Sequence, residues 1–209
     1  ILANHRSTLR DGWLQVSGFY RSLDDDYDFD RRSKESGVAG AFEHKTRNYG
    51  AAFEGKIAFA ELNWDFSGQI SRDSLVSSTD LNTALLDSRY YGSFRLAPSY
   101  DFAAPHDQTV TIRFGGVVDT SSQDSNAVSP VFDITLNTPT SSGRRTLKME
   151  FAGTSQLPGY TALNSKPNGL FGGNADLKRE KARQVSVTLA HEGRVGCGEA
   201  EAVHRVDEN

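Results

Sequence analysis

The sequence predicts an all-β fold, and the first evidence is a pair of long alternating segments within residues 88–119. In the first segment the even positions 90–102 are apolar or small, while most odd positions are polar or charged. The same pattern resumes over residues 110–118 after a short polar turn. Successive side chains of a β-strand point to opposite faces of the sheet. This alternation therefore predicts strands that have one face in an apolar medium and the other in a polar one.

The length of these segments is the second observation. Globular strands commonly have about 5–6 residues, and both segments keep the alternation well beyond that. A tilted strand needs about 9–11 residues to cross a bilayer. No apolar run approaches the roughly 18 residues of a membrane helix, which excludes helical spans. The mean hydropathy of −0.51 does not argue against membrane strands, because these carry apolar residues only at alternate positions.

Alternation and turn residues predict further strands along the chain. The Asp11-Gly12 pair is typical of a tight hairpin turn. Two prolines, Pro98 and Pro130, count against central strands of a soluble sheet at their positions, because proline lacks the N–H that a ladder requires. The other predicted strands cover residues 1–9, 13–23, 42–57, 62–71, 128–137, 146–154 and 183–189, with one more beginning near Glu199.

The connections between these strands alternate in length, which is the third observation. Those centred near residues 11, 60, 105, 141 and 195 are short, whereas those near 31, 80, 124 and 168 are mostly long. In an up-and-down meander every second connection lies at the same end of the sheet. Short turns at one end and longer loops at the other are typical of outer-membrane barrels.

These observations predict that residues 1–209 are part of one domain, an antiparallel up-and-down transmembrane β-barrel, and contribute about nine or ten of its strands. Apolar side chains would face lipid and polar ones a watery lumen, because backbone groups in lipid must all be paired. The alternative is a soluble β-sandwich that binds carbohydrate or protein. A sandwich would bury its apolar face and would show the same binary pattern.

Composition excludes several other classes of function. A net charge of −4 and a pI near 5.7 argue against nucleic acid as a partner. The single cysteine, Cys197, excludes an internal disulfide or a cysteine zinc cluster. The five histidines show no metal-ligand spacing. We find no nucleophile with a base and no carboxylate pair at a defined separation, so we expect a protein that is not an enzyme.

One acidic stretch has the spacing of a calcium loop. The polar loop predicted for residues 24–37 carries alternate carboxylates and an acid eleven positions after the first, namely at Asp24, Asp26, Asp28 and Glu35. Phe29 stands where the sixth position of such a loop requires glycine. A solvated acidic loop is therefore the favoured interpretation, and loop calcium is the alternative. No other cofactor is expected.

The region from residue 151 to residue 189 resembles TonB-dependent outer-membrane receptors. A strand ending in Thr154-Ser155 enters a long connection, and a Gly-Asn-Pro-x-Leu-x-Pro-Glu-like element and a strand follow. The chain matches that element at Gly173, Asn174, Leu177 and Glu180, and it has Ala175 and Arg179 in place of the two prolines.

The resemblance implies a barrel of 22 strands, an N-terminal plug and energy supplied by the TonB complex. The chain begins without a methionine or export signal and ends just after an alternating run begins. We therefore expect a fragment that lacks the plug and the remaining strands, located in the bacterial outer membrane with lipid as a partner. The full receptor would import a scarce nutrient such as a ferric siderophore or cobalamin. In the longest connection, residues 156–180, the expected ligand-facing side chains are Tyr160, Asn164, Asn168 and Phe171.

Overall fold

The computed structural model describes the chain except for residues 29–40, 80, 85–86, 167–171, 195 and 209. The described part contains ten strands and a single-turn helix: β1 (Leu2–Leu9), β2 (Gly12–Asp28), β3 (Ala41–Phe59), β4 (Leu62–Ser78), β5 (Ser88–Ala104), β6 (Gln108–Ser121), β7 (Ala127–Thr140), β8 (Gly143–Gln156), α2 (Tyr160–Asn164), β9 (Glu180–Gly193) and β10 (Gly196–Glu208). No helix in this part is long and apolar enough to cross a membrane.

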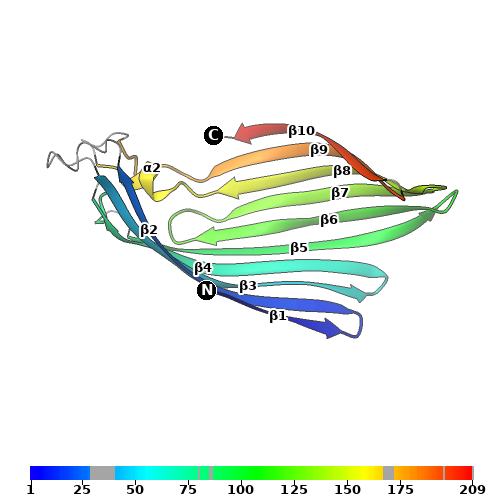
Figure 1. Cartoon of the computed structure of the whole chain (residues 1–209), viewed down its shortest axis with the longest axis horizontal. Coiled ribbons are helices and arrows are strands. Elements are labelled where there is room, and N and C mark those ends of the chain that lie inside the picture. Colours follow the sequence, from blue (N-terminus) through cyan, green and yellow to red (C-terminus); the bar gives the residue numbers. More distant parts are fainter. Residues whose placement is uncertain (29–40, 80, 85–86, 167–171, 195, 209) are drawn as a thin grey trace.

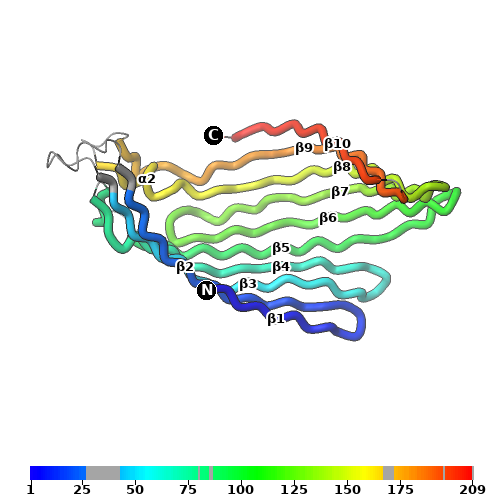
Figure 2. Tube along the Cα trace, in the orientation of Figure 1, coloured from blue at the N-terminus to red at the C-terminus, as the bar shows by residue number. Residues whose placement is uncertain are grey.

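All ten strands form one antiparallel sheet in which each strand pairs with its neighbours in sequence (Figure 1). This confirms the predicted all-β meander and its strand number. The chain trace runs back and forth across the sheet, with β1 and β10 at its two edges (Figure 2). Because the described strands form one sheet rather than two packed layers, they do not form a sandwich.

The predicted alternation of connection lengths is also confirmed. Two residues separate β1 from β2 and two separate β3 from β4, whereas 122–126 and 157–179 separate β6 from β7 and β8 from β9. In Figure 1 the short turns gather at one end of the sheet, and the β6–β7 connection and α2 lie at the other.

Several strands are longer than their side-chain patterns predict, and β2 and β4 extend into predicted loops. Strand β2 runs to Asp28, where a loop from residue 24 was expected, and β4 runs to Ser78, where a loop from residue 73 was expected. Backbone pairing with β3 continues through both extensions. A ladder needs only paired N–H and C=O groups, so it continues where the alternation of apolar and polar side chains stops.

The two prolines do lie inside interior strands. Pro98 pairs with Trp64 of β4, but the ladder from β5 to β6 is interrupted between the pairs Leu96↔Gly116 and Ser99↔Arg113. Pro130 pairs with β6, and the ladder from β7 to β8 begins only at the following residue. Each proline therefore lies beside a gap in the ladder, where the absence of its N–H removes no hydrogen bond between the strands.

The polar face of the sheet is the enclosed face and the apolar face is the exposed one. Along β7, Ser129 and Asp133 are 5% and 3% exposed, whereas Val128 and Phe132 are 75% and 41% exposed. The carboxylate of Asp133 lies 3.4 Å from the guanidinium of Arg113, which also contacts Asp65. Side chains crowd together on the inside of a curved sheet, so this burial indicates that the sheet curves around its polar face.

Candidate functional site

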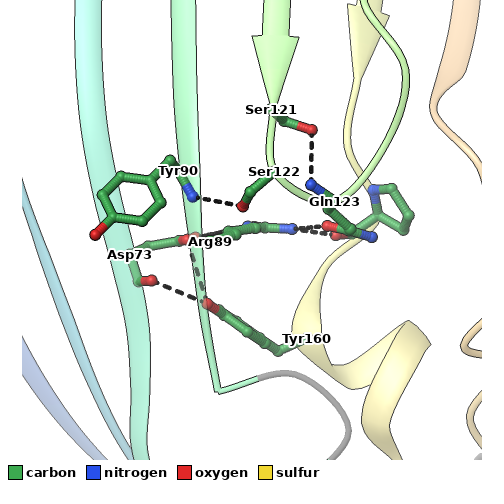
Figure 3. Close-up of polar contacts among 8 residues, drawn as sticks. Asp73, Arg89, Tyr90, Ser121, Ser122, Gln123 and Tyr160 are labelled. Atoms are coloured by element: carbon green, nitrogen blue, oxygen red, sulfur yellow. Dashed lines mark hydrogen bonds and ion pairs between the residues drawn. The ribbon is translucent and has the colours of Figure 1, made fainter.

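The polar face carries a hydrogen-bonded network at the end where the long connections lie, and Arg89 of β5 is its centre (Figure 3). Its Nε donates to both carboxylate oxygens of Asp73 on β4, at 3.1 and 2.9 Å. Its Nη1 donates to Gln123 Oε1 at 3.1 Å and to the carbonyl of Pro158 at 2.6 Å. One side chain thus joins two strands to both the β6–β7 and the β8–β9 connections.

Tyr160, the first residue of α2, completes this network. Its hydroxyl lies 3.1 Å from the Asp73 carbonyl and 3.2 Å from Asp73 Oδ1, and its ring lies 4.9 Å from Arg89 Cζ. Burial raises the pKa of the Tyr160 hydroxyl above its ordinary value, and the charge of Asp73 raises it further. The hydroxyl therefore remains protonated and donates to Asp73.

A second network holds the end of the same connection. The Asp119 carboxylate of β6 accepts from the hydroxyls of Tyr91 and Ser155, each at 2.7 Å. Arg179 donates from Nη1 to Ser155 Oγ at 3.2 Å, and its backbone N–H donates to Asp124 Oδ2 at 2.7 Å. Backbone N–H groups, first that of Arg179 and then that of Ser125, lower the pKa of Asp124. A proline at 179, as in the resembled element, would lack this N–H.

Between these two anchors, the β8–β9 connection packs against the β4–β5 connection. Leu81 and Leu163 are buried together with Asn164. The backbone N–H of Asn82 donates to the carbonyl of Asn164 at 2.7 Å, and Lys166 Nζ donates to the Thr79 carbonyl at 2.7 Å. The described parts of the two connections therefore pack together at this end of the sheet.

A hollow of about 480 Å³ opens beside Tyr160 on the polar face. Phe19 and Leu23 give it apolar surface, and Arg21 gives it a positive charge. The buried Oδ1 of Asn48 in its lining has no hydrogen-bond partner among the described residues. Its complete lining is Phe19, Arg21, Leu23, Thr46, Arg47, Asn48, Asp73 and Tyr160. A small molecule with an acidic group, a hydrogen-bond donor and an apolar part would match this lining.

The four residues expected to face a ligand have different positions. Tyr160 lines the hollow. Asn164 is completely buried between the two connections, which gives it a place in their packing. Asn168 and Phe171 lie outside the described residues. The β2 and β3 side chains of the hollow were missed, because their alternation marks the polar face without indicating which polar positions a distant connection would approach.

The calcium candidates are only partly described. Asp24 and Asp26 lie on β2 rather than in a loop, and Asp24 forms an ion pair with Lys45 at 3.1 Å. Asp28 ends that strand, and Glu35 lies outside the described residues. In the part of the chain that the structure covers, no group of three or more His, Cys, Asp or Glu side chains is placed to share a metal ion. Loop calcium stays the untested alternative.

We expect Arg89 to control the order of the β8–β9 connection. Arg89→Gln will remove its ion pair with Asp73, and hydrogen bonds to charged groups contribute about 1.5–3 kcal/mol. The amides of Leu163 and Ser165, which donate within the α2 turn, should then exchange with solvent about tenfold faster. Hydrogen exchange read by mass spectrometry checks this.

The matched control for that measurement is Arg95→Gln, which removes the same charge from the same face of β5. Tyr160→Phe, which removes only the hydroxyl, should give a smaller acceleration than Arg89→Gln. Unchanged exchange at both amides in Arg89→Gln would show that the network does not hold this segment.

Comparison of the chain with known protein families, with curated proteins and with solved structures found no match.

Proposed function

We propose that this chain forms part of the wall of an outer-membrane β-barrel, in a TonB-dependent receptor that imports a scarce nutrient such as a ferric siderophore or cobalamin. The observation that carries the proposal is the reversed burial of the two faces. Large apolar side chains such as Phe114 and Val128 are more than half exposed, whereas Asp119 and Asp133 are nearly buried. A sheet of this kind suits hydrocarbon outside and water inside.

The height of the apolar band supports the same proposal. On β5, Tyr90 and Tyr100 face outward ten residues apart, with only uncharged residues at the outward positions between them. Ten residues span about 33 Å at roughly 3.3 Å per residue. At a tilt of about 45° this corresponds to about 23 Å, close to the apolar band of about 25 Å that aromatic girdles flank in outer-membrane barrels.

Neighbouring strands keep the band free of charge. The outward positions of β6 from Val110 to Thr120 and those of β7 from Val128 to Leu136 are apolar, small or hydroxyl-bearing. On β4 the first outward charge after Trp64 is Arg72, beside Tyr90. An ion at the band centre would cost about 2–4 kcal/mol, so this distribution fits a lipid-facing surface.

Nutrient capture would take place at the end with long connections. The hollow beside Tyr160 lies there on the polar face, and the two networks hold the β8–β9 connection across that face. In the proposed barrel this end faces outside the cell and the short turns face the periplasm. The plug and the TonB contact would come from parts of the receptor beyond this chain, and further strands pairing with β1 and β10 would close the sheet.

Cell fractionation tests the proposal directly. The full-length protein should sediment with the outer membrane, resist extraction by high salt and be released by detergent. A soluble periplasmic protein of similar size provides the control for cell lysis. Recovery of the full-length protein wholly in the soluble fraction would overturn the proposal.

A further inference from the structure

The apolar face has a depression near its long-connection end. It follows a cross-strand row of mostly small side chains, Gly18, Ala51, Ile70, Gly92 and Thr120. Bulkier rows flank it, one containing Tyr20, Tyr49, Arg72 and Tyr90 and the other containing Val16, Phe53, Phe94 and Val118. Two hollows of about 730 and 650 Å³ adjoin along the small row, since Ala51, Ile70, Gly92 and Thr120 line both. Together they form a groove running from the tyrosine row toward the centre of the apolar band.

Arg72 is the single charged residue among those that line the groove. Its Cζ lies 5.2 Å from the centre of the Tyr90 ring, and its Nη2 donates to Ser88 Oγ at 3.3 Å. Its Nε is buried without a hydrogen-bond partner among the described residues, which also place no carboxylate within ion-pair distance of Arg72. A partly satisfied guanidinium thus stands at one end of an otherwise uncharged groove.

We propose that this groove binds an acidic lipid that carries a phosphate, with that phosphate at Arg72 and one acyl chain along Ala51, Ile70 and Gly92. The charge and the shape point to the same occupant. A guanidinium binds phosphate oxygens strongly, and an acyl chain fills an apolar depression that flanking aromatic rings enclose. Tyr49 and Tyr90 stand at the level where tyrosines of membrane proteins meet lipid headgroups. The inference rests on the proposed function, because it places the apolar face in a bilayer.

The test uses the full-length protein in nanodiscs of phosphatidylcholine mixed with phosphatidylglycerol in equal amounts. Mild detergent extraction followed by native mass spectrometry counts the phospholipids that remain bound. We expect retained phosphatidylglycerol to exceed phosphatidylcholine about fivefold, the factor expected for one cation near an anionic lipid. Arg72→Gln should abolish the preference, and Arg72→Lys should restore most of it.

Two further variants separate charge from shape. Arg144→Gln removes an exposed charge at the opposite end of the sheet, where Arg144 pairs with Glu192, and should leave the preference unchanged. Ala51→Leu fills the groove and should lower retention of both lipids while Arg72 is intact.

Equal retention of the two lipids by the wild-type protein, or an undiminished preference in Arg72→Gln, would overturn the lipid site. Because the protein would still be embedded in the nanodisc, the proposed function would stand. Retention of lipid irrespective of headgroup would also overturn it, since that outcome indicates a general apolar surface. Failure of the protein to enter nanodiscs of either composition would instead overturn the proposed function, and the lipid site with it.

Discussion

Phe94→Arg will sharply lower the stability of the membrane-embedded protein, whereas Ser93→Arg on the other face of the same strand will have little effect. Phe94 lies outward near the middle of the apolar band and is 46% exposed. An arginine at the bilayer midplane costs about 2–4 kcal/mol on the lipid face of a barrel. Ser93 lines a hollow of about 490 Å³ on the polar face, where water and Gln69 can solvate a guanidinium.

Urea unfolding from lipid vesicles measures this difference as the free energy of unfolding. Phe94→Ala is the necessary control, because the Phe94 ring also packs 6.4 Å from that of Phe53, and this variant removes the ring without adding a charge. We expect Phe94→Arg to be clearly less stable than Phe94→Ala. Equal losses for arginine at 93 and 94 would mean that the two faces meet the same solvent.

Gly115→Ala will destabilise the sheet, whereas Gly116→Ala will not. A Cβ at Gly115 would lie 2.1 Å from the Leu96 carbonyl oxygen and 2.7 Å from Ala97 Cα, so the backbones of β5 and β6 would have to separate. A Cβ at Gly116 would meet only the Ser129 carbonyl oxygen, at 3.4 Å. Overpacking of this kind costs about 1–3 kcal/mol.

The neighbouring glycine makes the comparison sharp, because both variants add the same methyl group to the same strand. Glycine in a strand interior lowers the stability of the folded state by about 0.5–1 kcal/mol relative to alanine, so Gly116→Ala should be neutral or slightly stabilising. Thermal unfolding in detergent micelles measures both. A Gly115→Ala protein as stable as the parent would show that the two strands do not approach so closely.

The long-connection end owes its order to pairs of residues that are far apart in sequence. Asp73 and Tyr160 are 87 positions apart, and Arg89 and Pro158 are 69 apart. Alternation predicts Arg89 and Asp73 only as members of the polar face. Nothing local to either residue indicates that a connection 69 residues later folds back across it.

The β8–β9 connection illustrates the same limit at its other end. The alternation places Thr154 on the polar face, yet the hydroxyl that reaches Asp119 is that of Ser155. The ladder between β7 and β8 ends at the pair Val131↔Ala152. Beyond that pair β8 stays paired with β9 to Gln156, and the direction that Ser155 takes toward Asp119 does not follow from period-two alternation.

What the sequence by itself determined is the set of strands, their two faces and the alternation of short and long connections. Each follows from local chemistry, since successive side chains of a strand point to opposite faces and turn residues interrupt the pattern. The tertiary structure alone decided how far β2 and β4 extend, how Pro98 and Pro130 fit into interior strands, and that Arg89 and Arg179 hold one connection at its two ends. Backbone pairing and long-range hydrogen bonds set these features, and they depend on which segments meet in space rather than on the order of residues within any one of them.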